Sequence, residues 1–152
     1  MDLQKESTTK GLSPEVTDAI ARLADGDMVG LVSDSQGAVT GSLLAAADSI
    51  TARQLACAVR HSTGVLCAAI HERRAERLGL PPIVNGSGRR ESFRVPVDHA
   101  ATTSGSSASD RAMTFRALAD AATGPADLRR PGHVFPVCAL PTALPPGRES
   151  AR

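Results

Sequence analysis

A histidine behind a Pro-Gly turn is the side chain of this sequence best suited to acid–base chemistry. His133 lies in LRRPGHVFP (residues 128–136), directly before a short apolar run. Imidazole changes its protonation state near neutral pH, so a histidine held on an ordered turn is a candidate general acid or base. A lone histidine is more often structural, and the turn by itself leaves both roles open.

A second group of polar side chains lies between a predicted helix and a predicted strand. RHSTG (residues 60–64) brings together Arg60, His61 and Thr63. A cation, an imidazole and hydroxyls at such a junction could bind an anionic substrate. Arginine and histidine near a helix C-terminus also complement the helix dipole, and this is the structural alternative.

A third loop, TTSGSSASDR (residues 102–111), is rich in small and hydroxyl residues and leads into a predicted helix. Its hydroxyls, among them those of Thr103 and Ser107, could cradle a phosphate or carboxylate together with the amides at the helix start. The alternative is a flexible serine-rich loop in which Asp110 only caps the helix.

The sequence predicts no metal site and no cofactor. SDSQGAVTG (residues 33–41) has Asp34 as its only ionisable residue. Cys67 with a histidine could form a nucleophile pair, but a cysteine within an apolar strand is typically inert, and we expect buried thiols. The histidines are far apart and lack carboxylates at metal-ligand spacing; they are His61, His71, His99 and His133.

Composition favours one ordinary domain and argues against nucleic-acid binding. The 152 residues are 41% hydrophobic and nearly neutral, with 17 Lys and Arg against 16 Asp and Glu. There is no Trp or Tyr, so the aromatic platforms on which single-stranded nucleic acids stack are missing. No apolar run approaches the roughly 20 residues of a membrane span, and the three cysteines form no CxxC pair. We therefore expect a soluble cytoplasmic protein that binds neither nucleic acid nor membrane.

Apolar periodicity predicts that helices and strands alternate between residues 13 and 140. This alternation predicts one mixed α/β (α+β) domain over 13–140, with a sheet flanked by helices and mobile segments at 1–12 and 141–152. Helices are expected after the capping residues Ser13 and Thr51, across 71–80, and after Ser109 or Asp110. Strands are expected over 28–32, 42–48, 65–70, 92–97 and 133–137.

Four blocks of the sequence, in order, resemble the 3,4-dihydroxy-2-butanone 4-phosphate synthase family, whose members act on ribulose 5-phosphate in riboflavin biosynthesis. RHSTGVLC is similar to the family pattern R-H-G-S-G-V-[VL]-C, and LGLPPIV is similar to L-x-L-P-x-M-V. TTSGSSASDRAMTFRALAD is similar to V-T-T-G-x-S-A-x-D-R-x-x-T-[IV]-R-A-L-A-D, and DLRRPGHVFP to [DE]-[FL]-x-R-P-G-H-[VI]-F-P. The resemblance covers residues 14–139.

The resemblance implies a site as well as a fold. It makes His133 a surviving member of a catalytic group, and it implies a homodimer with active sites at the subunit interface. The residues that it places in the binding of a small-molecule substrate are Arg60, His61, Thr63, Thr103, Ser107, Asp110 and Arg111.

The sequence also departs from the family pattern. Members carry D-D-E-x-R-E-N-E-G-D-L between the first two strands, where the carboxylates bind metal and substrate; here SDSQGAVTGSLL keeps only Asp34 and Gly41 at comparable positions. Members continue after G-H-V-F-P to a second histidine and a later glutamate, whereas this sequence runs into VCALPTALPPGRESAR. These differences predict a C-terminally shortened member without metal ligands and without the parent activity.

We therefore expect an enzyme recruited to an intermediate of specialised metabolism. His133 would perform metal-independent acid–base chemistry there, as in an isomerase, lyase, dehydratase or cyclase. Two alternatives stay open. One is a non-catalytic homologue that dimerises or binds a ligand, and the other is a residual synthase that acts on ribulose 5-phosphate.

Overall fold

Strand β7 (Leu128–Cys138) is the centre of the main sheet. It pairs in parallel with β3 (Cys67–Ile70) and antiparallel with β5 (Arg90–Arg94) and β6 (Val97–His99), while β4 (Pro82–Val84) pairs with β5. The strand order is β3-β7-β5-β4, with β6 added on β7. With 11 residues, β7 is long enough to pair with three strands at different points along its length.

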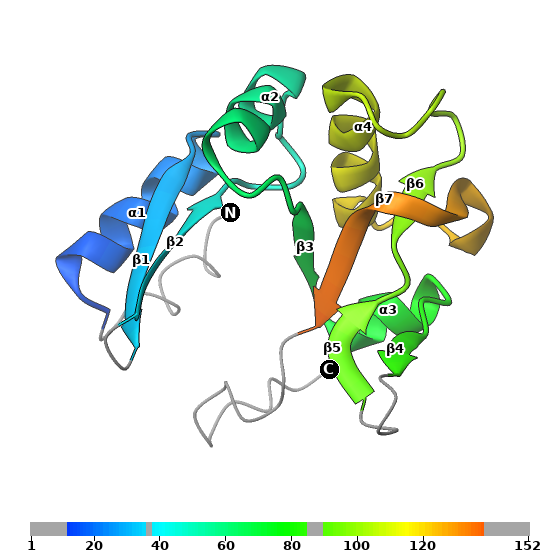
Figure 1. Ribbon diagram of the computed structural model, residues 1–152, viewed down its shortest axis with the longest axis horizontal. Helices are drawn as coiled ribbons and strands as arrows, with labels where there is room; N and C mark the ends of the chain where they lie inside the picture. Colours follow the sequence, from blue (N-terminus) through cyan, green and yellow to red (C-terminus); the bar gives the residue numbers. More distant parts are fainter. Residues whose placement is uncertain (1–11, 36–37, 85–89, 139–152) are drawn as a thin grey trace, which may run out of the picture.

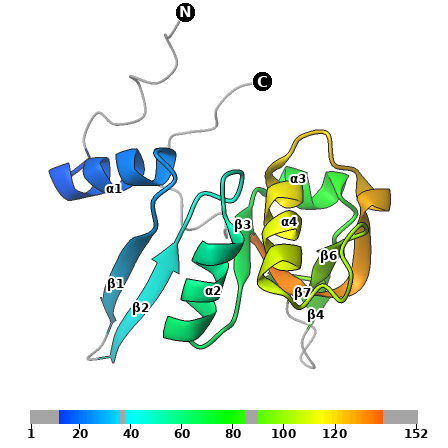
Figure 2. The same cartoon turned by 90° about the horizontal axis from the view of Figure 1, so that it is seen from above.

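Two helices pack together beside this sheet. Helix α2 (Ala52–His61) contacts α4 (Ala108–Ala119), and α4 also contacts β3, β6 and β7; Figure 2 shows the two helices side by side. Thr51 begins α2 with a capping box, because its side chain accepts from Gln54 N–H while the Gln54 side chain accepts from Thr51 N–H. The fully buried side chains between these elements include Leu55, Leu78, Leu118, Val97 and Val134.

Shorter elements complete the described chain. Helix α3 (Glu72–Arg77) follows β3, and the 3-10 turn η1 (Pro125–Asp127) leads into β7. The computed structural model describes residues 12–35, 38–84 and 90–138 (Figure 1). The predicted fold class, a mixed α/β domain with sheets flanked by helices, is confirmed. The predicted mobile segments 1–12 and 141–152 lie outside the described residues except for Leu12, and the domain limits 13–140 stay a prediction.

The N-terminal part of the fold is a separate hairpin with a helix beside it. Within the described residues, strands β1 (Val29–Ser35) and β2 (Ala38–Leu44) pair only with each other, and α1 (Pro14–Ala24) lies beside them (Figure 1). Helix α1 is capped by Ser13, as predicted, and has no buried residue. Successive strand residues point to opposite faces, and apolar side chains lie on both faces. Leu31 on one face is 54% exposed, and Val32 on the other is 71% exposed. A lone two-stranded hairpin is marginally stable in water, so this apolar surface is suited to an intermolecular contact.

Two predicted strands have different limits in the structure. The strand expected over 42–48 is wrong beyond Leu44, because the hairpin pairing runs from Ala38 to Leu44. The next residues form a loop, from which Ala45 and Ala47 pack against the core. The strand expected over 92–97 is divided into β5 and β6, because Pro96 lacks the N–H that a continuous ladder needs. Pro96 thus lies between two strands in the structure.

The cysteines differ from the predicted buried thiols. Cys57 and Cys67 are exposed, and only Cys138 is buried. Cys67 lies on the opposite face of β3 from the buried Ala68, and this face of the strand is exposed. No helix within the described ranges is both long enough and apolar enough to cross a membrane.

Candidate active site

An irregularity in the pairing of β6 with β7 creates the site. Val97 pairs with Val134, but the next residue, Asp98, pairs with Arg129. Residues 130–133 of β7 therefore have no partner on β6 and form a bulge. Bulges of this kind redirect a side chain that a regular ladder would hold in the pleat.

The residue types in the bulge explain its course. Pro131 has no N–H to donate, so it loses nothing where the ladder is interrupted. Gly132 lies so close to the backbone of Val97 that an added Cβ would overlap it. The backbone therefore requires glycine at 132 and tolerates proline at 131, and the bulge that they form positions the imidazole of His133.

His133 and Asp98 form a directed pair. The backbone N–H of His133 donates to Asp98 Oδ1 at 2.9 Å, and the His133 ring Nδ1 lies 2.8 Å from Asp98 Oδ2. The His133 side chain is 47% exposed, whereas the Asp98 side chain is 7% exposed. A buried carboxylate thus orients an imidazole that reaches solvent, which is the arrangement expected of a proton-transferring histidine.

The loop before α4 is fastened to β7 and covers Asp98. The Arg129 guanidinium donates to Thr102 O at 2.6 Å, to Thr102 Oγ1 at 2.7 Å and to Thr103 O at 3.3 Å. Gly105 has φ +78°, and a Cβ at this residue would overlap the Asp98 carboxylate. Arg129 therefore fixes the loop that packs against the Asp98 carboxylate, the partner of His133.

Asp110 organises the same loop from inside. Its Oδ2 accepts hydrogen bonds from Thr103 Oγ1 at 2.9 Å and from Gly105 N–H at 3.1 Å, and its own N–H donates to Ser107 Oγ at 3.0 Å. Burial by itself would raise the pKa of Asp110, but the hydrogen bonds from Thr103, Gly105 and Ser107 outweigh it and hold that pKa below the usual value. Asp110 is thus an ionised anchor for the loop.

The start of α4 differs from the prediction. The capping residue is Ser107, whereas Ser109 or Asp110 was expected. Asp110 cannot cap the helix because its carboxylate is turned back to the loop, and Ser109 lies within the first turn, where its hydroxyl contacts that of Ser107 at 2.9 Å. Thr114, one turn further on, joins α4 to β6 by accepting from His99 N–H at 3.0 Å and donating to Asp110 O at 3.0 Å.

The remaining predicted site residues lie on α2 and α4. Arg60 and His61 end α2 and Thr63 follows, and all three are exposed. In Figure 2 the C-terminal end of α2 and the N-terminal end of α4 are on the same side of the molecule. Arg111, in the first turn of α4, is half-buried, and its Nε has no hydrogen-bond partner within the described residues.

Two residues of this site were not predicted from the sequence. Asp98 contacts His133. Arg129 contacts the loop that covers Asp98. The available signal for Asp98 was a carboxylate directly after the strand predicted over 92–97. For Arg129 there was no such signal, because it is one of two adjacent arginines and only the register of β7 distinguishes them.

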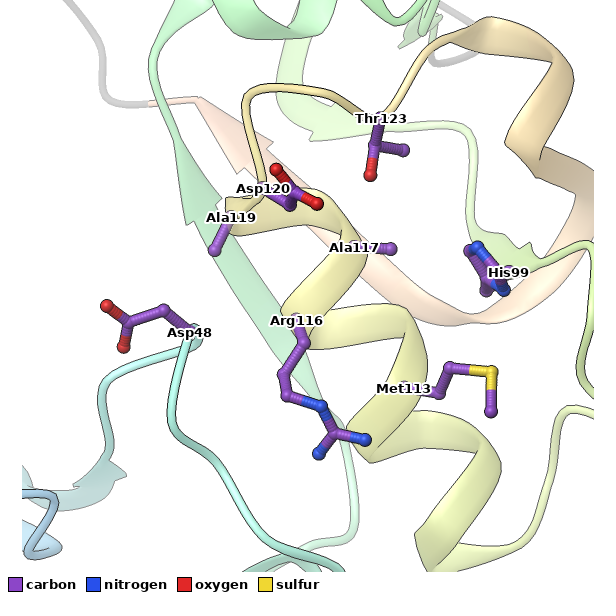
Figure 3. Close-up of a pocket in the computed structure, with 8 residues that line it drawn as sticks. All are labelled: Asp48, His99, Met113, Arg116, Ala117, Ala119, Asp120 and Thr123. Carbon is purple, nitrogen blue, oxygen red and sulfur yellow. The ribbon is translucent and has the colours of Figure 1, made fainter.

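Two hollows in the described part of the chain lie away from His133. A cavity of about 390 Å³ runs along the outer side of α4 (Figure 3), where Arg116 and Asp120 come from the helix and Asp48 comes from the loop after β2. A second hollow, of about 570 Å³, lies between α3 and β5. There Arg94 pairs with Glu72, and its Nε donates to Cys138 Sγ at 3.1 Å. No predicted site residue lines either hollow, and the ordered His133 pair is the stronger evidence for a site.

The donor set of the described residues does not fit a magnesium ion. Magnesium requires several oxygen ligands in near-octahedral geometry. Within residues 12–35, 38–84 and 90–138, no group of three or more His, Cys, Asp or Glu side chains could hold a metal ion. Asp98, which pairs with His133, and Asp110, which holds the covering loop, each accept hydrogen bonds from the protein.

Comparison with known proteins decides the family. The family model described as 3,4-dihydroxy-2-butanone 4-phosphate synthase (DHBP synthase) matches residues 17–145. The chain belongs to the DHBP synthase family. It is 40% identical over 133 residues to the DHBP synthase of Agrobacterium fabrum, with 86% of this chain and 62% of that protein covered. It is 38% identical over 139 residues to the DHBP synthase of Pyricularia oryzae, with 89% and 60% covered.

Solved structures of the DHBP synthase family have the same fold. A DHBP synthase crystallised in complex with two magnesium ions superposes with a TM-score of 0.77 at 38% identity, covering 84% of this chain and 61% of that one. The resemblance drawn from the four sequence blocks is therefore confirmed. The chain spans about 60% of the length of these relatives.

The DHBP synthase relatives overturn the function expected from the sequence. Proteins about 40% identical over most of this chain are named DHBP synthases, so the prediction of a metal-independent enzyme recruited to specialised metabolism is wrong, and so is the exclusion of DHBP synthase activity. The non-catalytic alternative gains no support from them. The β1–β2 stretch departs from the family pattern and the blocks around His133 agree with it, but the family match covers both.

Proposed function

We propose that this chain functions in forming 3,4-dihydroxy-2-butanone 4-phosphate, with ribulose 5-phosphate as the substrate and His133 as the proton-transferring residue. The observation that carries the proposal is the pair of His133 with Asp98, built by the bulge that RPGH encodes. The parent reaction rearranges the carbon skeleton through an enediol and releases formate. Forming an enediol requires removal of a proton next to a carbonyl, which is the task of a positioned general base.

His133 suits that first proton transfer. Its side chain is 47% exposed, so its free ring edge can meet a bound sugar phosphate, while Asp98 holds the other edge. The fastened loop from Thr102 to Ser107 restricts movement near the ring. Positioned acid–base groups contribute about 10²–10⁴-fold to a rate, which is the size of effect asked of His133.

The phosphate and hydroxyls of the substrate need donors, and the chain offers them near the ends of α2 and α4. We assign Arg60, His61 and Thr63 to the anionic group, because they are exposed and include a cation. Thr103, Ser107 and Arg111 are assigned to the sugar side of the site. Asp110 contributes indirectly, because its carboxylate is occupied with holding the loop.

The described residues supply no magnesium site, so no step of this proposal passes through a metal. A metal ion that acts here would need at least some ligands from outside residues 12–35, 38–84 and 90–138. The proton transfer by His133 is independent of where those ligands come from.

Formate release tests the proposal. The full chain is incubated with ribulose 5-phosphate and Mg²⁺, and formate is measured beside the same reaction with His133→Gln and with His71→Asn, which changes an exposed histidine that caps α3. We expect formate from the parent chain and from His71→Asn, and a loss of at least about 100-fold in His133→Gln at unchanged melting temperature. A folded parent chain that releases no formate above background contradicts the proposal.

Family membership also supports a proposal about the oligomeric state of this chain. We propose a homodimer with its sites at the subunit interface. The exposed apolar hairpin β1–β2 supports a contact between chains, because Leu31, Val32 and Val39 are all more than half exposed. A cytoplasmic location and the absence of nucleic-acid and membrane partners stay predictions from the sequence.

A further inference from the structure

We propose that Asp98 is the positioning residue that fixes the tautomer of His133, keeping the proton on Nδ1 and leaving Nε2 as a proton acceptor. This inference rests on the proposed function only for its effect on rate. The tautomer itself is a property of the chain without substrate.

Both carboxylate oxygens of Asp98 contact His133. An ionised carboxylate accepts hydrogen bonds and donates none. Oδ1 accepts the backbone N–H of His133 at 2.9 Å, and Oδ2 is 2.8 Å from the ring Nδ1 of the same residue. A hydrogen bond between Nδ1 and Oδ2 therefore requires the proton to be on Nδ1.

The surroundings keep Asp98 in this orientation. Its side chain is 7% exposed, so water offers little competition for the carboxylate. Gly105 lies directly against the carboxylate, leaving no room for a Cβ. Because Arg129 fastens the loop that contains Gly105 to β7, the strand that carries His133 also holds the cover over Asp98.

The double contact makes one substitution unusually informative. In Asp98→Asn the side chain keeps its shape but has one oxygen and one NH₂. The backbone N–H of His133 requires an acceptor, so the Asn oxygen takes the place of Oδ1 and the NH₂ faces the ring. An NH₂ must donate to Nδ1, and this moves the ring proton to Nε2. Asp98→Asn therefore inverts the tautomer.

The inversion would remove the proton acceptor from the exposed edge of the ring. Nε2 then carries a hydrogen and cannot accept the substrate proton. The corresponding exchange in the Ser-His-Asp triad lowers kcat about 10⁴-fold by the same reversal, with the geometry kept. We expect a loss on the order of 10³-fold in kcat here, with KM changed less than about 3-fold.

The test is the ¹⁵N spectrum of the full chain labelled in histidine, recorded without substrate where the imidazole is neutral. The His133 signals are assigned by their disappearance in His133→Gln. We expect the hydrogen on Nδ1 in the parent chain and on Nε2 in Asp98→Asn. Asp127→Asn is the matched control, because Asp127 also accepts a backbone N–H, that of Gly124 at 2.8 Å, without contacting a histidine.

Two results would overturn the inference. One is a parent chain in which His133 carries its hydrogen on Nε2, and this result decides the matter even if Asp98→Asn fails to fold. The other is a folded Asp98→Asn chain in which the tautomer is unchanged. Absence of formate release with the expected tautomers contradicts the proposed function and leaves the positioning role of Asp98 standing.

Discussion

Gly105 lies against the carboxylate of Asp98 so closely that the loop before α4 and the strand β6 interlock at this point. The glycine has φ +78°, and its N–H donates to Asp110 at 3.1 Å. One residue without a side chain thus separates the two buried carboxylates of the site. The orientation of the His133 ring therefore depends on this loop through Asp98. Among the described hydrogen bonds, none joins the loop to the ring itself.

Replacing Gly105 by alanine is expected to destabilise the chain and to loosen the Asp98 pair. Gly64→Ala is the matched control, because Gly64 also has φ +78° but nothing within 4 Å of an added Cβ. The left-handed backbone costs both variants about 1–2 kcal/mol. The overlap with Asp98 should cost Gly105→Ala a further 1–3 kcal/mol or so. Chemical denaturation measures the difference, and equal losses in the two variants would show that Asp98 is not confined by this glycine.

Acid is expected to release the loop through Asp110. The pKa of Asp110 is lower in the folded chain than in the unfolded one, so the stabilisation is present above the unfolded-state pKa and is lost as pH falls through the folded-state pKa. Hydrogen exchange at the Gly105 amide, expressed as a protection factor, should fall in that range. In Asp110→Asn the protection should be lower at neutral pH and should no longer depend on pH there. A parent protection factor that stays constant through the acid range contradicts this role.

Arg74 is expected to hold the C-terminal end of α4. Its guanidinium donates to Leu118 O at 3.2 Å, to Ala117 O at 3.3 Å and to Thr123 O at 3.2 Å, and it also contacts Asp120 O. Burial, and secondarily the like charge of Arg77, lower the pKa of Arg74. Arg74→Ala should lose about 2–3 kcal/mol of unfolding free energy, because these acceptors lose a charged donor.

The control for Arg74 is its neighbour. Arg73 lies in the same helix and is exposed. Arg73→Ala should change the unfolding free energy by less than about 0.5 kcal/mol. Thermal unfolding of the two variants side by side measures the contrast. Similar values would mean that the carbonyls of α4 are satisfied without Arg74.

The apolar hairpin is expected to mediate the proposed dimer. Val32 and Val39 are each 71% exposed, and the double variant Val32→Ser, Val39→Ser removes two apolar side chains without touching the core. Light scattering coupled to size exclusion should give a dimer for the parent chain and a monomer for the double variant. Val65→Ser changes another exposed valine, at 61%, and should stay dimeric. A monomeric parent chain, or a double variant that stays dimeric, contradicts the proposed interface.

Local signals in the sequence were sufficient for several elements of the fold. Ser13 before Pro14 and Thr51 three residues before Gln54 are capping patterns, and both helices begin where these patterns place them. The start of α4 was predicted at Ser109 or Asp110, but the helix is capped by Ser107. Only the tertiary hydrogen bonds of the Asp110 carboxylate select Ser107.

Long-range register was not available from the sequence. The strand expected over 133–137 extends to Leu128, because β7 continues through Pro131 as a bulge and pairs again beyond it. Asp98 is 35 residues away from His133 along the chain, and neither residue signals the other. Their contact results from the shifted pairing of two strands, which no periodicity of one segment encodes. The four sequence blocks identified the family, and the structure was needed to find the partner of the histidine.

Exchange of a carbon-bound proton on either carbon next to the carbonyl of ribulose 5-phosphate, C1 or C3, tests the central claim most directly. This exchange reports the proton transfer assigned to His133 and requires no later step. The full chain is incubated with substrate in deuterated buffer, and loss of that proton signal is followed by NMR. The account predicts exchange with the parent chain and its loss in His133→Gln. Exchange at equal rates in both folded proteins, or in neither, would contradict it.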